Sequence, residues 1–144
     1  MPKTTACAAA LLLLTALIHY EALRALDHLV PRLRWPRRTH IVVVIVALFG
    51  AHALEIVLYA LAFFLLARHA DLGAIGRHGP LTFNLSLYFS FETFSTLGYG
   101  DIAPAGAIRL LAGTESLNGL LLIGWSSSYA HIAMQRAAGS AAQV

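Results

Sequence analysis

Charged residues and cysteine are both scarce in this sequence. Only 12% of its 144 residues are Asp, Glu, Lys or Arg, whereas 58% are hydrophobic. Soluble domains typically carry about 25% charged residues, so this composition disfavours a water-soluble fold and indicates a protein of the lipid bilayer. The single cysteine, Cys7, excludes an intrachain disulfide and a zinc site built from cysteines.

Arginine supplies nearly all of the positive charge, and it is unevenly placed. The net charge is +3, and four arginines fall within the stretch PRLRWPRR, residues 31–38. A short basic cluster can contact nucleic acid, but beside long apolar runs it is more typical of a cytoplasmic loop that faces lipid phosphates. We therefore expect the bilayer as a partner and no nucleic acid. The regularly spaced arginines of a voltage-sensing helix are missing.

Four hydrophobic segments follow one another along the chain. The second, residues 41–67, would be about 40 Å long as a helix, enough to cross a hydrocarbon core of about 30 Å with tilt. The fourth, residues 107–134, is also long enough to span, whereas the third, residues 82–94, is too short. A polar, glycine-rich stretch, residues 68–80, is expected to be a loop. The pattern predicts an all-α membrane protein.

The first segment, from about residue 5 to residue 30, allows three interpretations. The basic cluster after it is expected on the cytoplasmic side, which would place a spanning first helix with its N-terminus outside. Lys3 before an apolar run also resembles a signal peptide, although no small-residue cleavage site leads into a hydrophilic mature chain. Alternatively, the segment lies on the membrane surface, since Glu21, Arg24 and Asp27 share one helix face.

The stretch FETFSTLGYGDIAP, residues 91–104, differs from the rest of the chain. A short helix and a non-helical loop at membrane depth leave backbone carbonyls without partners, which is tolerated only inside protein or beside a water-filled path. Gly98 and Gly100 can adopt positive φ angles without a steric penalty. Alternating such residues with ordinary ones can turn successive carbonyls the same way, and a row of carbonyls can replace the hydration shell of a potassium ion.

This motif closely resembles the selectivity filter of potassium channels, with its TVGYG loop. Residues 41–136 resemble their pore module of outer helix, external turret, pore helix, filter and inner helix. The resemblance implies such a module here, preceded by an N-terminal helix and basic linker at residues 1–40 and followed by a short tail at residues 137–144. Since four identical loops build the filter and this chain has one, a homotetramer is also implied.

The resemblance assigns K+ binding to the backbone carbonyls of Thr96, Leu97, Gly98 and Tyr99, with Gly100 completing the filter. The hydroxyl of Thr96 would close the innermost site. Leu97 stands where valine or isoleucine is commoner in the family; its apolar side chain would point away from the ions, which concerns filter rigidity more than selectivity. Potassium is the permeant ion, and no cofactor or other metal is implied.

Three residues near the filter are expected to support it. Glu92 precedes the filter on the pore helix and Asp101 follows it, and in two-helix bacterial channels the matching acids meet behind the filter, where one of them holds a proton. Tyr88 stands where relatives carry an aromatic that bonds to the aspartate. Plain aromatic packing is the alternative for Tyr88.

The fourth segment matches the inner helix of the family. Gly119 is the candidate gating hinge, and close packing of helices through a small residue is the alternative. Steps of three and four residues along a helix define the expected pore-facing set: Leu120, Ile123, Ser127, His131 and Gln135. Four copies of His131 would gather near the cytoplasmic mouth, where they could respond to pH; the alternative is that His131 faces lipid headgroups or a neighbouring helix.

Three ionisable residues, His52, Glu55 and Glu115, fall inside the expected membrane helices. Such residues are costly in a bilayer and usually face protein or water. His52 and Glu55 are one helical turn apart, at a depth close to that of Glu115, so we expect all three to form one hydrogen-bonded cluster. A proton- or metal-sensing role is the alternative. The remaining histidines, in loops or at helix ends, are expected to be solvated.

Taken together, these features predict a potassium-selective channel subunit that passes several times through a cell membrane, either a plasma membrane or a bacterial inner membrane. A poorly selective cation channel and a non-conducting membrane scaffold are the alternatives. Ser127 and His131, four residues apart, could form the nucleophile–base pair of an intramembrane hydrolase. No glycine-flanked nucleophile motif accompanies them, and pore lining explains both, so we do not expect an enzyme.

Overall fold

Three long helices and one short helix make up nearly all of the chain that the structure describes. The computed structural model describes residues 2–69, 73–76 and 81–139. Its elements are, in chain order, α1 (Pro2–Leu29), the 3-10 turn η1 (Val30–Arg32), α2 (Arg37–His69), β1 (Gly73–Ile75), α3 (Phe83–Phe94), β2 (Pro104–Gly106) and α4 (Ile108–Gly139). The predicted all-α architecture, with a short helix between two long ones and a further helix before them, is confirmed.

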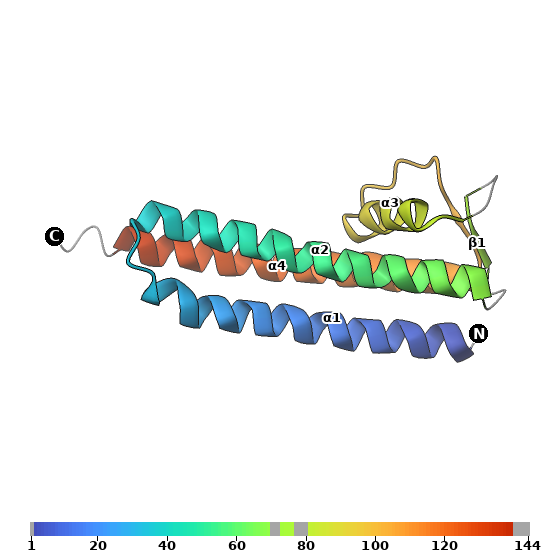
Figure 1. Ribbon diagram of the computed structural model, residues 1–144, viewed down its shortest axis with the longest axis horizontal. Coiled ribbons are helices and arrows are strands. Elements are labelled where there is room, and N and C mark those ends of the chain that lie inside the picture. The colour runs from blue at the N-terminus through green and yellow to red at the C-terminus, as the bar shows by residue number, and fades with distance from the viewer. Residues whose placement is uncertain (1, 70–72, 77–80, 140–144) are drawn as a thin grey trace.

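The long helices α1, α2 and α4 lie side by side (Figure 1), with α2 running opposite to the other two. Near the N-terminal end of α1 the core contains Tyr59, Phe63 and Leu111, none of which is exposed. Near the α1–α2 connection a second core joins Leu26 to Val44. Burial of such side chains stabilises the bundle by about 25 cal/mol per Å² of apolar surface in water, but between helices in lipid close packing takes over that role.

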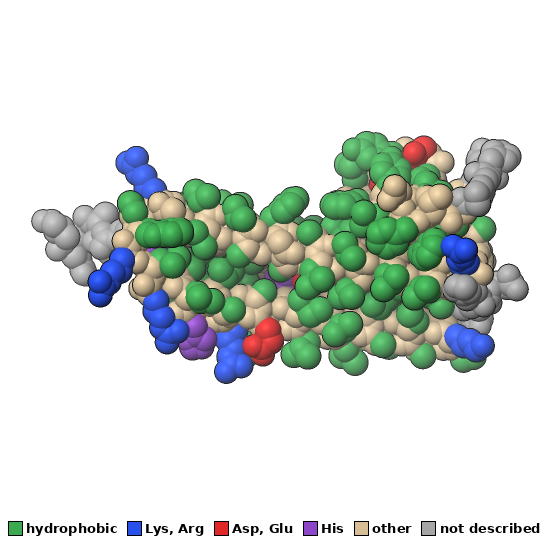
Figure 2. All heavy atoms as spheres, viewed as in Figure 1, with side chains coloured by type: hydrophobic (Ala, Val, Ile, Leu, Met, Phe, Trp, Pro, Cys, Tyr) green, Lys and Arg blue, Asp and Glu red, His purple; other side chains and the backbone are tan. Residues whose placement is uncertain are grey.

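The outer surface of this bundle is apolar. Leu13, Val46 and Phe49 are 64% to 70% exposed, and hydrophobic side chains cover the visible face of the long helices (Figure 2). Polar residues, by contrast, are buried among the helices: Thr15, His19, Glu55, Glu115, Asn118 and Ser126. This distribution suits hydrocarbon, where polar groups must find partners inside the protein. Two helices, Pro2–Arg32 and Arg38–Arg68, are long and apolar enough to cross a membrane.

The short helix α3 lies against α2 and α4 near the end of the bundle that holds the N-terminus (Figure 1). Its first turn is capped by Thr82, whose hydroxyl accepts a hydrogen bond from the Leu85 N–H at 3.2 Å. Along its length, the ring of Phe89 meets the ring of Phe63 edge to face, and the Ser90 hydroxyl contacts the Ile56 carbonyl at 2.9 Å. These contacts fix the direction in which α3 delivers the chain to the loop at residue 95.

The sequence predicts a loop at residues 68–80, but part of this stretch forms a short strand. Within its described part, β1 pairs antiparallel with β2, and Gly73 faces Gly106. Gly73 has φ 144°, and a Cβ there would lie 2.0 Å from the Ala105 carbonyl oxygen, so only glycine fits. Residues 70–72 and 77–80 of the predicted loop lie outside the described residues. The pairing ties the segment before α3 to the segment after the GYG motif.

The ends of the helices differ modestly from expectation. α2 begins at Arg37, inside the basic cluster, and α4 continues past the predicted start of the tail to Gly139; residues 140–144 lie outside the described residues. α1 lies lengthwise along α2 and α4, with seven buried residues. This arrangement favours a first segment that runs beside the other helices over one that lies on the membrane surface.

Candidate functional site

The loop after α3 has an alternating backbone. Among the described residues, Thr96 is the one non-glycine residue with positive φ, at 58°, and it is followed by Gly98 at 54° and Gly100 at 83°. Every second residue from 96 to 100 is therefore left-handed. The sequence indicated this conformation for the two glycines, but not for Thr96, because threonine rarely adopts it. Such alternation can turn successive carbonyls to one side.

The same loop makes few contacts with its own chain. All five residues from Thr96 to Gly100 are exposed, with Tyr99 at 67%, and a Cβ built on Gly98 or Gly100 would meet nothing within 4 Å. The loop is held at its start by two backbone bonds, from Thr96 N to Thr93 O at 3.1 Å and from Leu97 N to Glu92 O at 3.0 Å. Apart from contacts of Tyr99 with two neighbouring side chains, the surface of the loop is exposed.

The three expected support residues all lie next to this loop. Glu92 is 4% exposed and its Oε1 accepts a hydrogen bond from the Tyr99 N–H at 3.3 Å. The Tyr88 hydroxyl donates to Asp101 Oδ2 at 3.3 Å, and its ring stacks on the ring of Tyr99 with centroids 6.2 Å apart. Partial desolvation and the nearby carboxyl groups of Glu92 and Asp101 raise the pKa of Tyr88 to about 12, so its hydroxyl keeps the hydrogen that it donates.

The expected contact between Glu92 and Asp101 is not formed within the described part of one chain. Each carboxyl has a different partner, because Glu92 points to the backbone of the loop and Asp101 points to the phenol of Tyr88. The two acids therefore contact different partners on two sides of the loop. A groove of about 470 Å³ runs behind the loop and is lined by Glu92, Thr96, Gly98 and Arg109, among others.

Gly119 packs tightly against the end of α3. A Cβ at this position would lie 2.2 Å from the carbonyl oxygen of Phe94, the last residue of α3. The structure thus gives direct support to the packing interpretation of this glycine. The hinge interpretation stays a prediction, since a single arrangement of α4 says nothing about its bending.

The predicted pore-facing residues lie on exposed parts of α4. Leu120 is 57% and Ile123 37% exposed in the single chain. Ser127 donates to the Ile123 carbonyl at 2.9 Å, and His131 Nε2 contacts the Gln135 side chain at 3.0 Å. Because Ser127 and His131 bond elsewhere, the nucleophile–base contact of a hydrolase is not formed.

The predicted cluster of His52, Glu55 and Glu115 is wrong in one member. His52 Nδ1 does contact Glu55 Oε2 at 3.0 Å, but the third partner is His19 of α1, whose Nδ1 lies 3.0 Å from Glu55 Oε1. Glu115 instead contacts the Ser90 hydroxyl of α3. The long helices are apolar on nearly every side, so their hydropathy pattern does not predict which face turns inward. Depth in the membrane alone could not separate the two carboxyl groups.

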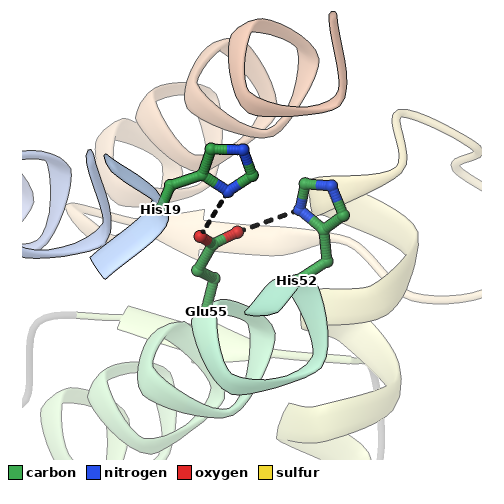
Figure 3. A group of neighbouring side chains, drawn as sticks. All are labelled: His19, His52 and Glu55. Carbon is green, nitrogen blue, oxygen red and sulfur yellow. Dashed lines mark hydrogen bonds and ion pairs between the residues drawn. The ribbon is translucent and has the colours of Figure 1, made fainter. Parts of the chain in front are cut away.

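His19 was expected to be solvated, and it is fully buried. Figure 3 shows its ring and that of His52 pointing toward the carboxylate of Glu55, which lies between them. The far nitrogens of both rings meet one hydroxyl, that of Ser126 on α4: His52 Nε2 at 2.9 Å and His19 Nε2 at 3.2 Å. The sequence did hold a signal for this burial: His19 is an ionisable residue that follows the long apolar run of the first segment, in the stretch TALIHYEAL.

Further polar contacts connect α1 with α4, among them one from the Tyr129 hydroxyl to Asp27 Oδ1 at 3.2 Å. The Asn118 side-chain amide donates to Thr15 Oγ1 at 2.7 Å and contacts the Tyr59 hydroxyl at 3.2 Å. At the other end of the bundle, Arg136 donates to Asp27 Oδ1 at 3.0 Å. Together with the His19–Ser126 contact, these bonds join α1 to the candidate inner helix at three levels.

The comparisons with known proteins agree with the predicted module. A family described as an ion channel matches residues 41–136, about two thirds of the chain. None of the curated proteins and none of the solved structures compared with the chain matches it. The matched range runs from the first residues of α2 through the exposed loop to the last turns of α4, which are the elements of a pore module. On this match the protein is a membrane protein that belongs to the ion channel family.

Proposed function

We propose that this chain is one subunit of a homotetrameric, potassium-selective channel, and that the loop from Thr96 to Gly100 is its selectivity filter. The observation that carries the proposal is the alternation of left-handed residues at 96, 98 and 100 in a loop whose residues are all exposed. A loop of this kind offers backbone carbonyls for which the described residues provide no hydrogen-bond partner. Carbonyl oxygens in a ring can replace the hydration shell of K+.

The exposed surfaces support an assembly of several copies, and the number four follows from the resemblance to the potassium-channel filter. A single loop cannot surround an ion, and identical loops around a rotation axis make a closed ring. The described part of one chain leaves three features exposed: the loop, the groove behind it, and the side chains Leu120 and Ile123. In a tetramer, neighbouring subunits would cover the groove, and the exposed face of α4 would line the path below the filter.

The placement of charge supports an orientation in the membrane. Arg32, Arg34 and Arg38, all exposed, lie at the α1–α2 connection, and exposed Arg136 lies at the same end of α4. Basic residues favour the cytoplasmic side. The three long helices would then each cross the bilayer, with the filter near the outer face of a plasma membrane or a bacterial inner membrane.

The deciding experiment measures ion flux into liposomes that hold the purified chain. Rubidium uptake driven by a potassium gradient, with little sodium uptake, is the result that we expect. Equal uptake of sodium would indicate a poorly selective cation channel, and no uptake of any cation would indicate a non-conducting scaffold. The mass of the detergent-solubilised complex tests the assembly, for which we expect four copies of the 15.5 kDa chain.

A further inference from the structure

The cluster of His19, His52 and Glu55 is not used by the proposed ion pathway. Its residues come from α1 and α2, and the exposed fractions of their side chains are 0%, 17% and 0%. Two imidazole nitrogens and one carboxylate oxygen lie within 4.8 Å of one another. Figure 3 shows these atoms converging from two helices, with the carboxylate between the two rings.

Together with Ser126, the cluster forms a closed ring of four polar contacts. Glu55 contacts His19, His19 contacts Ser126, Ser126 contacts His52, and His52 returns to Glu55, at 2.9 to 3.2 Å throughout. Each contact needs one hydrogen. An ionised carboxylate brings none, two neutral imidazoles bring one each and the serine brings one. Three hydrogens therefore serve four contacts, and the ring is satisfied either by one more proton or by a metal ion that replaces two of the contacts.

A metal ion removes this deficit. If Nδ1 of His19 and Nδ1 of His52 bind a metal together with the carboxylate of Glu55, the hydrogen of each neutral imidazole must be on Nε2. Both Nε2–H groups then donate to the Ser126 oxygen, which can accept two hydrogen bonds. The serine hydrogen is free to bond one turn back along α4, as those of Ser127 and Ser128 do.

We infer that His19, His52 and Glu55 form a binding site for a divalent first-row transition-metal ion, with Ser126 orienting both imidazole ligands. Two nitrogens and one carboxylate suit zinc, which binds such ligands at about 2.0–2.2 Å and leaves a fourth position open for water. Magnesium and calcium prefer oxygen ligands and are disfavoured. A divalent ion bound by one carboxylate leaves a net charge of +1 on the site. This is less charge to bury among the helices than the +2 of the ion alone.

The distances between the three ligand atoms are compatible with zinc binding after movements of the side chains. Ligand atoms of a tetrahedral zinc site lie about 3.3 Å apart, as the bond lengths require. His19 Nδ1 lies 3.0 Å from Glu55 Oε1 and His52 Nδ1 lies 3.0 Å from Glu55 Oε2, so a single carboxylate oxygen is already at ligand spacing from one of the two rings. The other pairs, all within 4.8 Å, must close by at most about 1.5 Å to reach that spacing, which rotation of the rings and of the carboxylate can supply. His52, at 17%, is the one partly exposed side chain of the three, so an ion would reach the site past it.

Metal at this site would fix the bundle next to the pore. It would join α1 to α2 directly and hold α4 through Ser126, which precedes the predicted pore-facing residue Ser127. The ring of His52 also lies 5.6 Å from the ring of Phe94, at the end of α3. An effect of the bound metal on ion flux rests on the proposed channel function, whereas metal binding itself does not.

The test measures zinc binding by the purified full-length chain in detergent after chelator treatment, by isothermal titration and by the shift in thermal midpoint. We expect one tight site per chain and a rise in the midpoint. Glu55→Gln and His52→Gln should each lower the affinity at least tenfold, and Ser126→Ala should lower it about 10- to 100-fold. His28→Gln, at an exposed position of α1, is the matched control and should leave the affinity unchanged.

A spectrum of the cobalt-loaded wild-type chain keeps the inference testable if a variant fails to fold. Intense visible absorption typical of four- or five-coordinate cobalt, lost when zinc is added, supports the site. The inference is overturned if the wild-type chain binds no zinc, if cobalt shows only the weak spectrum of its hydrated ion, or if folded Glu55→Gln binds zinc as tightly as wild type. Flux into liposomes is not needed for any of these outcomes, so a failed channel assay would leave this result standing by itself.

Discussion

At the scale of single residues, the conformation of Gly98 makes the most direct prediction. Its φ of 54° is one that other residues adopt at a cost of about 1–2 kcal/mol. A Cβ would meet nothing within 4 Å in the single chain, so Gly98→Ala should leave folding intact. In the assembled filter we expect potassium flux to fall below detection, because strain and crowding act in four loops together.

The measurement for Gly98→Ala is rubidium uptake by liposomes, with complex size checked by gel filtration. Loss of uptake together with a normal complex would assign the defect to the loop. Wild-type uptake and wild-type selectivity in this variant would rule out residues 96–100 as the filter.

The hydrogen bonds around Glu115 indicate that its carboxyl group is protonated and that glutamine can replace it. The Ser90 hydroxyl contacts both the Ile56 carbonyl and Glu115, but it has only one hydrogen to donate. A carbonyl cannot donate, so the hydrogen of Ser90 serves Ile56, and Glu115 must supply the other as a neutral acid. Glu115 Oε2 is buried with no partner among the described residues, which also suits an uncharged group.

Glu115→Gln should therefore keep the thermal midpoint in detergent close to that of wild type, since an amide can donate to Ser90 in place of the acid. Glu115→Ala should destabilise the fold by about 1–3 kcal/mol, through a cavity and a lost bond. A marked fall in the midpoint of the glutamine variant would mean that Glu115 is ionised.

At the scale of elements, the contact between α3 and α4 depends on one glycine. Gly119→Ala would place a methyl group 2.2 Å from the Phe94 carbonyl, so α3 must move away from α4. Because α3 ends two residues before Thr96, we expect ion uptake to fall at least tenfold while helix content by circular dichroism is retained.

Gly50→Ala is the matched control for this prediction. Gly50 lies in α2 with nothing within 4 Å of a built Cβ, and alanine favours a helix by about 1 kcal/mol over glycine. Uptake should stay at the wild-type level. Equal behaviour of the two alanine variants would show that the α3–α4 contact does not position the loop.

At the scale of the whole molecule, the two ends of α2 should lie on opposite sides of the membrane. Trp35 and Ala74 are both exposed, the first before α2 and the second in β1 after it. With Cys7 replaced by alanine, a single cysteine at either position can be labelled with a membrane-impermeant maleimide. In right-side-out vesicles we expect Ala74→Cys to react at once and Trp35→Cys to react only after permeabilisation.

Reaction of both positions from the outside would contradict the orientation that the arginines indicate. It would also contradict a spanning α2. Folding of the two variants can be compared by their gel-filtration profiles, and the cysteine-free background is the blank for labelling.

The sequence by itself was enough to predict the helices, the pore module and the loop. These features are local: spans of apolar residues set the helices, Thr82 caps α3, and the glycines at 98 and 100 permit the left-handed backbone. The family match over residues 41–136 confirms the module. Potassium selectivity, four-fold assembly and the role of each filter residue stay predictions.

Only the tertiary structure decided which polar groups meet inside the bundle. α1, α2 and α4 are apolar on nearly every side, so no amphipathic stripe tells which face of a helix turns inward. Their rotation follows from close packing, as where Gly119 admits the Phe94 carbonyl, and from polar groups that must find partners away from water. That is why His19 of α1 joined Glu55, while Glu115, at a similar depth, turned to Ser90.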